Sequence, residues 1–98
     1  MKRLLAIAML VTLGACDTKS PKTLTIWWAQ WAPADGLQEL GRDFEKETGI
    51  PVVVHQIPWP NYADQVNLEF GNSTTKFDIV IGDSQWIGRG ATKGLYVD

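Results

Sequence analysis

The sequence predicts an α/β fold: three strand-helix units whose parallel strands take the order 2-1-3 in one sheet. Three short runs rich in β-branched and aromatic residues alternate with three segments of helical character, which is typical of a parallel sheet covered by helices. Connections between parallel strands are right-handed, and a helix can cover either face of the sheet. With the first helix on one face and the second on the other, the strands take the order 2-1-3.

The first unit is expected to be a strand over residues 23–29 followed by a helix over residues 35–48. Asp35 is the expected N-cap of this helix, with Gln38 three residues later, and Gly49 ends it. Three apolar side chains at helical spacing are expected to form its buried stripe: Leu37, Leu40 and Phe44.

The second unit is expected to be a strand over residues 52–57 and a helix that begins after Asn61. Asn61 is the expected N-cap, and Gly71 and Asn72 follow the last turn. The buried face of this helix is expected to contain Ala63, Val66 and Phe70.

The third unit is expected to be a strand over residues 77–81 and a helix over residues 85–93 that Gly94 closes. In a sheet of order 2-1-3, the switch point lies between the first and third strands. Ligands of such sheets bind there, outside the carboxyl ends of the strands. The sequence therefore predicts one crevice formed by the residues after these two strands, which are Gln30, Trp31 and residues 82–86.

The amino-terminal end has the pattern of an export signal. Basic residues precede an apolar run that is shorter than the roughly 20 residues of a membrane-spanning helix, and small residues follow it. Residues 13–16, Leu-Gly-Ala-Cys, resemble the lipobox of bacterial lipoproteins, in which the cysteine thiol carries a diacylglycerol. We expect a signal peptide over residues 1–15, a lipid on Cys16 and a polar tether over residues 16–22. Such an anchor would place the mature chain in the cell envelope, at the periplasmic face of the inner membrane or the outer face of the plasma membrane.

The composition limits the classes of partner and cofactor. Lys and Arg number 9 against 11 Asp and Glu, and part of the basic charge lies in the signal peptide, so no surface for nucleic acid is expected. Cys16 is the only cysteine, which excludes an intrachain disulfide. His55 is the only histidine and has no cysteine or carboxylate cluster around it, so neither a metal site nor a cofactor is expected.

Residues 23–98 are expected to be the first part of a lobe. A chain of this length buries only about 60% of the surface that it exposes when unfolded. Three parallel strands with only three helices would leave the sheet half exposed at its faces and edges. The fold is therefore expected to be incomplete.

Tryptophan is the most informative residue type, since the chain has 5 Trp among its 98 residues. Indole faces stack on the C–H surfaces of sugars, and nearby Asp, Gln or Asn side chains hydrogen-bond to sugar hydroxyls. Trp27 and Trp28 point to opposite faces of the first strand, and Trp27 is expected to pack under a helix layer. The predicted ligand-binding residues are Gln30, Trp31, Asp83, Ser84, Gln85 and Trp86, followed by Trp59 and Tyr62 near the same rim.

Residues 82–84 allow two other interpretations. Asp83 or Ser84 could simply cap the helix that follows. Gly82-Asp83-Ser84 also resembles the serine block of GDS-type esterases, in which the block opens the domain and a histidine base comes late in the chain. Here two strand-helix units precede the block, and His55 lies inside a strand, so we expect that the chain is not an enzyme.

Four segments, taken in their order and spacing, resemble the amino-terminal lobe of extracellular solute-binding protein family 1, the receptors of carbohydrate ABC importers. The resemblance extends over the whole mature chain. The segments are residues 24–27 (LTIW), 44–50 (FEKETGI), 58–62 (PWPNY) and 77–89 (FDIVIGDSQWIGR).

The resemblance implies a periplasmic-binding-protein type II lobe of a two-lobed receptor that closes on its ligand by hinge bending and docks on ABC permease subunits. In relatives, ligand contacts arise after the first and third strands. Ala29 and Trp31 stand where the maltodextrin receptors carry polar groups, so a sugar other than maltodextrin is expected. The expected function is capture of a sugar outside the cytoplasmic membrane for import, and the alternative is a sensor or binding lipoprotein that is not coupled to transport.

Overall fold

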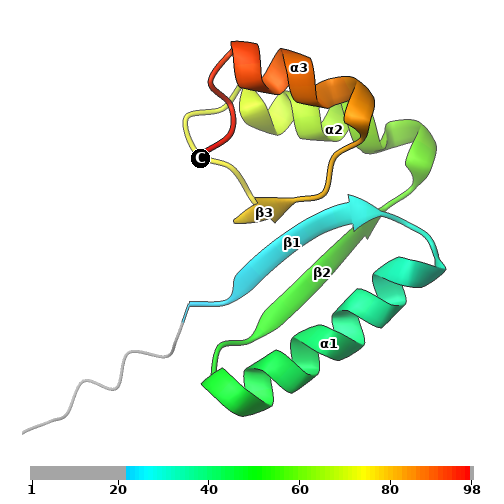
Figure 1. Ribbon diagram of the computed structural model, residues 1–98, viewed down its shortest axis with the longest axis vertical. Helices are drawn as coiled ribbons and strands as arrows, with labels where there is room; N and C mark the ends of the chain where they lie inside the picture. The colour runs from blue at the N-terminus through cyan, green and yellow to red at the C-terminus, as the bar shows by residue number, and fades with distance from the viewer. Residues whose placement is uncertain (1–21, 98) are drawn as a thin grey trace, which may run out of the picture.

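The computed structural model describes residues 22–97 and contains three strand-helix units (Figure 1). The predicted signal peptide, Cys16 and all of the tether except Lys22 lie outside the described residues. Between residues 22 and 97, no helix has the length and apolar character needed to cross a membrane. The elements are β1 (Leu24–Ala29), α1 (Ala32–Thr48), β2 (Val52–Ile57), α2 (Trp59–Phe70), β3 (Ile79–Val80) and α3 (Ser84–Thr92).

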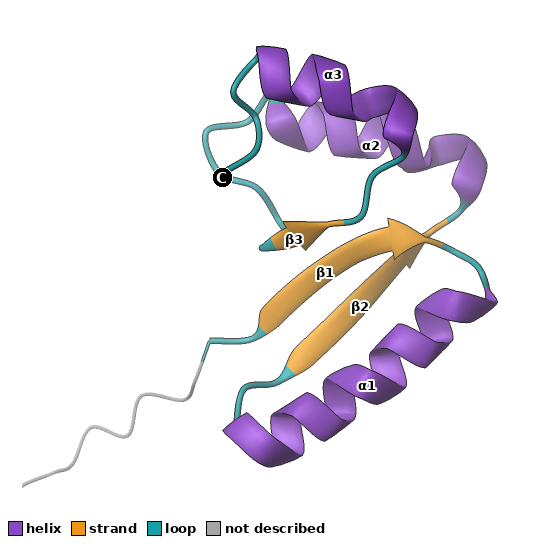
Figure 2. Cartoon of the chain, in the orientation of Figure 1, coloured by secondary structure: helices purple, strands orange, loops and turns teal. Residues whose placement is uncertain are grey.

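The strands form one parallel sheet of order β2-β1-β3, which confirms the predicted fold class and strand order. β1 pairs with β2 along its whole length but with β3 only at Ile26 and Trp27. α1 lies on one side of the sheet, and α2 and α3 lie together on the other (Figure 2). Because side chains alternate along β1, each face of the sheet has its own core cluster.

The two core clusters meet the two helix layers. On the side of α2, Trp27 is buried, which confirms its predicted role in the core. The buried members on this side are Trp27, Ala29, Ile57, Tyr62, Val66 and Phe77. On the side of α1, the buried members are Ile26, Ala34, Val52 and Val54.

Two helices begin earlier than predicted. α1 begins ahead of Asp35 with Pro33 in its first turn, and α2 begins ahead of Asn61 with Pro60 in its first turn. The sequence predicts that both prolines precede the helices, but each proline lies in the first helical turn instead. Proline is tolerated there because the N–H groups of the first turn have no partner within the helix, so the missing N–H of proline costs no helical hydrogen bond.

β3 is shorter than the predicted strand over residues 77–81. The carboxylate of Asp78 accepts a hydrogen bond from the backbone N–H of Thr25 (2.9 Å), where a regular ladder would offer a backbone carbonyl. The Asp78 N–H in turn donates to the Thr25 carbonyl (2.9 Å). A side chain therefore replaces part of the ladder at the start of β3.

The predicted buried stripe of α1 is wrong at two of its three positions. Leu37 is half-buried, but Leu40 is 65% exposed and Phe44 is 42% exposed. The residues of α1 that reach the sheet most closely are small: Ala34 and Gly41. Because these residues bring the helix backbone close to β2, the larger apolar side chains lie beside the contact instead of beneath it.

α2 buries the predicted Val66, while Ala63 and Phe70 are half-buried. Tyr62 and Glu69 are also buried. The Glu69 carboxylate accepts a hydrogen bond from the Lys76 backbone N–H (3.1 Å) and pairs with the Lys76 ammonium (3.2 Å). These contacts connect the end of α2 to the loop that leads to β3.

The close approach at Gly41 gives a stability prediction. A Cβ atom at Gly41 would stand 2.8 Å from Cγ1 of Val52, a stiff β-branched side chain, whereas a Cβ atom at Gly36 would meet nothing within 4 Å. We expect Gly41→Ala to lower the free energy of unfolding by about 1 to 3 kcal/mol through overpacking. Gly36→Ala, the matched control in the same helix, should raise it by up to about 1 kcal/mol through helix propensity. Urea unfolding of the full-length protein measures both changes, and equal effects would contradict the close packing of α1 on β2.

Candidate functional site

A pocket of about 510 Å³ opens beside the carboxyl ends of β1 and β3, at the switch point of the sheet. This volume is in the range of sites for small molecules. The pocket is lined by residues from the end of β1, the first turn of α2 and the segment after β3: Trp28, Ala29, Gln30, Trp31, Trp59, Tyr62, Ile81, Gly82 and Asp83.

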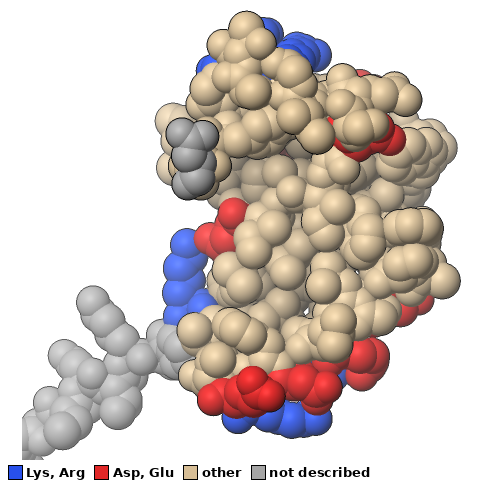
Figure 3. Space-filling model, viewed as in Figure 1, with Lys and Arg blue, Asp and Glu red and all other residues tan. Residues whose placement is uncertain are grey.

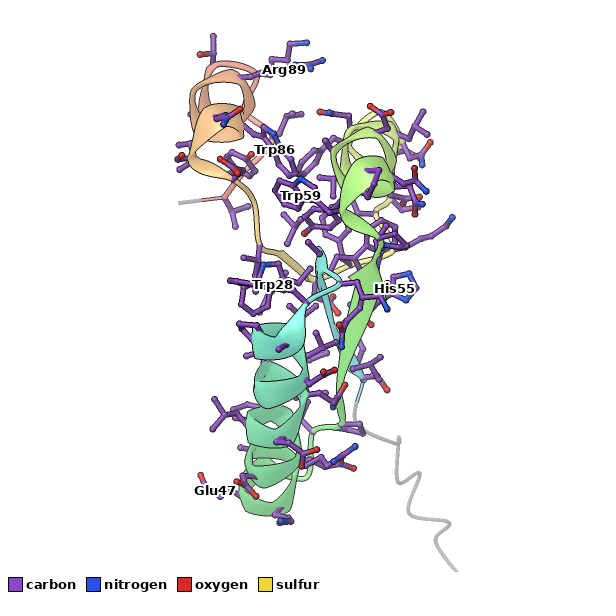
Figure 4. The ribbon with its side chains drawn as sticks, turned by 90° about the vertical axis from the view of Figure 1, so that its right-hand side faces the viewer. Trp28, Glu47, His55, Trp59, Trp86 and Arg89 are labelled. Carbon is purple, nitrogen blue, oxygen red and sulfur yellow. The ribbon has the colours of Figure 1, made fainter. Side chains whose placement is uncertain are left out.

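Aromatic rings form most of the apolar lining. Trp28 and Trp31 pack edge to face, with ring centroids 5.3 Å apart and planes at 84°. Across the end of the sheet, the Trp59 ring lies 6.5 Å from the Tyr62 ring. Trp31 is 52% exposed and Trp59 is 59% exposed, so both indoles present free surface to solvent. Figure 4 shows Trp28 at the start of α1 and Trp59 toward α2, while His55 points to the other side of the sheet from Trp28.

Tyr62 connects the two strand ends that border the pocket. Its hydroxyl lies 2.8 Å from the Trp27 carbonyl and 2.7 Å from the Ile81 carbonyl, so its single proton is donated to one or shared between both. The residue is 1% exposed, and burial raises the pKa of Tyr62 to about 12, against a smaller lowering by the hydrogen bond with Ile81. Because the Tyr62 hydroxyl bonds to backbone carbonyls in the described structure, Tyr62 contributes its ring, and not its hydroxyl, to the lining of the pocket.

Asp83 lines the pocket and also caps α3. Its Oδ1 atom accepts hydrogen bonds from the Gln85 backbone N–H (3.1 Å) and from the Ser84 hydroxyl (3.2 Å). The choice between capping by Asp83 and capping by Ser84 is therefore resolved in favour of Asp83. The carboxylate of Asp83 is held at the edge of the pocket by these two hydrogen bonds, which satisfy donors in the first turn of α3.

The predicted ligand residues divide into two groups. Gln30, Trp31 and Asp83 line the pocket together with Trp59 and Tyr62, whereas Ser84, Gln85 and Trp86 are not among its lining residues. The last group lies at the start of α3. Gln85 and Trp86 line a second pocket of about 180 Å³ between α2 and α3.

Trp86 packs against the core. Its ring lies 5.6 Å from the Tyr62 ring, and it contacts the cluster on the α2 side of the sheet. Trp28, which was not among the predicted ligand residues, lines the pocket instead. Its position as the penultimate residue of a strand that ends at the switch point is the sequence signal that could have identified it.

The electrostatics of the pocket are simple. Of the described residues that line it, Asp83 is the only charged one. In the view of Figure 3, the largest group of charged side chains lies at the lower end, where α1 runs. Among the charged residues of α1, Glu39 pairs with Arg42 and Asp43 pairs with Lys46. The charged end of α1 is therefore separate from the pocket.

Comparison with known proteins identifies a family. A family model described as bacterial extracellular solute-binding protein matches residues 28–98, which include every residue that lines the pocket. No curated protein and no solved structure matches the chain.

Proposed function

Because the chain belongs to the family of bacterial extracellular solute-binding proteins, we propose that it captures a sugar outside the cytoplasmic membrane and delivers it to an ABC permease. Membership of this family implies a small-molecule ligand that is bound outside the cell or in the periplasm. Binding of this kind involves no bond making or breaking in the solute. We propose further that this ligand is a sugar and that the partner in the membrane is an ABC permease.

The observation that supports a sugar is the exposure of two indoles in one pocket. Trp31 and Trp59 are large apolar side chains that the fold leaves more than half exposed, at the point where ligands of such sheets bind. Stacked aromatic pairs contribute about 0.5 to 1.5 kcal/mol beyond the burial of their area. We expect an indole stacked on a sugar ring to contribute a similar amount. Gln30 and Asp83 at the same rim supply hydrogen-bonding groups for hydroxyls.

We further propose that the pocket is one wall of a cleft. Residues 23–98 would be the first part of the amino-terminal lobe, and a second lobe would close over the ligand by hinge bending. In this proposal the exposed faces of Trp31 and Trp59 become buried only when the cleft is closed with a ligand inside. The signal peptide over residues 1–15 and a lipid on Cys16 would hold the receptor at the membrane, close to the permease.

Titration of the full-length protein with a panel of mono- and oligosaccharides tests the proposal. Ligand stacking changes the environment of Trp31 and Trp59, so we expect one member of the panel to quench or shift the tryptophan emission in a saturable way. Amino acids, short peptides and polyamines form the comparison set. If one of these saturates the emission change while no sugar does, the solute belongs to another class and the sugar proposal is wrong.

A further inference from the structure

We propose that Asp83 makes the pocket selective against anions, so that it accepts neutral sugars and rejects sugar acids and sugar phosphates. This inference rests on the proposed function and narrows its class of ligand. It follows from three features: the sign of the only charge among the described residues that line the pocket, the way in which Asp83 caps α3, and the second oxygen of the Asp83 carboxylate.

The first feature is the absence of a counter-charge. Asp83 is the only charged residue among the described residues that line the pocket. Arg89, the arginine closest to Asp83 in the sequence, lines the separate pocket between α2 and α3. Figure 4 shows Arg89 beyond Trp86, at the end of the view opposite to Glu47. An anion in the described pocket would therefore meet a carboxylate and no cation, and juxtaposed like charges are strongly unfavourable.

The second feature concerns the start of α3, which borders the pocket. The first backbone N–H groups of a helix lack helical partners and attract anions. Here the Oδ1 atom of Asp83 already accepts the Gln85 N–H at 3.1 Å and the Ser84 hydroxyl at 3.2 Å. Asp83 thus takes up the Gln85 N–H group and places its own negative charge at the start of α3.

The third feature is the second oxygen of the same carboxylate. Within residues 22–97, Oδ2 of Asp83 takes part in no hydrogen bond or ion pair, since both contacts of the cap use Oδ1. A carboxylate oxygen is an acceptor only. At the rim beside Trp31 and Trp59, it suits the hydroxyl donors of a neutral sugar and repels a carboxylate or a phosphate.

Asp83→Asn separates the charge from the cap, because asparagine caps helices as well as aspartate does. We would measure the dissociation constants of matched pairs that keep the same pyranose ring and differ in a carboxylate: D-glucose with D-glucuronate, D-galactose with D-galacturonate, and cellobiose with cellobiuronate. For the pair that binds, the wild-type protein should prefer the neutral member at least about tenfold. In Asp83→Asn, the affinity for the acid should rise, and the preference should fall at least about fivefold.

Asp43→Asn is the matched control, because it removes one carboxylate from the charged end of α1, outside the pocket lining. It should leave the preference unchanged. The effect of Asp83→Asn on the acid should also shrink at high salt, which screens charges.

Two results would overturn the inference while leaving the proposed function intact: wild-type protein that binds the acid as tightly as the neutral sugar, or an unchanged preference in Asp83→Asn. If no sugar in any pair binds while a peptide or an amine does, the proposed function fails and the inference fails with it.

Discussion

Replacing Tyr62 with alanine is expected to lower the free energy of unfolding by about 3 to 5 kcal/mol, the range for removal of a buried aromatic ring. The ring is buried in the cluster between the sheet and α2, and its hydroxyl connects the ends of β1 and β3. Both contributions disappear in Tyr62→Ala. Urea denaturation of the full-length protein, followed by circular dichroism, measures the change.

Tyr62→Phe isolates the hydroxyl from the ring. The Trp27 carbonyl keeps a hydrogen bond from the Ile81 N–H (3.0 Å), but the Ile81 carbonyl loses the only donor it has among the described residues. We expect a loss of about 1 to 2 kcal/mol. Tyr96→Phe is the control, because Tyr96 is 37% exposed and its hydroxyl makes no hydrogen bond within residues 22–97, and it should change stability by less than about 0.5 kcal/mol. Equal effects of the two substitutions would contradict the role of Tyr62 as a connection between the strands.

The high pKa of Tyr62 adds a pH dependence to the same comparison. Burial raises the pKa of the folded state to about 12, while an exposed tyrosine in the unfolded chain ionises near pH 10. The folded chain therefore holds the phenol proton more tightly, and the contribution to stability is complete below about pH 10 and declines as the pH rises toward about 12. The stability difference between wild type and Tyr62→Phe should shrink over this range.

The second large effect is expected on ligand binding. Trp31→Ala and Trp59→Ala should each weaken the binding of the sugar identified in the panel by about 2 kcal/mol or more, as for tryptophans at the centre of binding interfaces. Both side chains are more than half exposed, so the unfolding free energy should change little. Isothermal titration calorimetry of the full-length protein measures the loss.

Leu68→Ala serves as the control for truncation of an exposed apolar side chain, because Leu68 is 70% exposed on α2 and does not line the pocket. It should leave the affinity unchanged. Trp86→Ala tests the sequence-based prediction for the start of α3, since Trp86 contacts Tyr62 but not the pocket. Full affinity in both Trp31→Ala and Trp59→Ala would exclude the described pocket as the binding site.

The strand order could be predicted because alternation of strands and helices, together with the handedness of crossovers, leaves few arrangements. The starts of α1 and α2 could not be predicted in the same way, because Ala-Pro and Trp-Pro-Asn are compatible both with a loop before a helix and with the first turn of a helix. The exposure of Leu40 and Phe44 also escaped prediction. Periodicity identifies an apolar face of a helix, but which part of that face meets the sheet depends on how closely Gly41 lets the backbones approach.

Part of the pocket followed from topology alone. Gln30, Trp31 and Asp83 lie together because parallel strands place their carboxyl ends at one edge of the sheet. The direction in which Trp86 points from α3, and the use of the Tyr62 hydroxyl by two backbone carbonyls, depend on tertiary packing between α2, α3 and the sheet. No pattern within a single element determines such contacts.

The most direct test of the solute-binding pocket is a crystal structure of the full-length protein with the sugar identified by titration. We expect the sugar to lie at the carboxyl ends of β1 and β3, with a ring face stacked on Trp31 or Trp59 and a hydroxyl hydrogen-bonded to Asp83. A sugar bound elsewhere, with Trp31 and Trp59 still open to solvent, would contradict this assignment of the site.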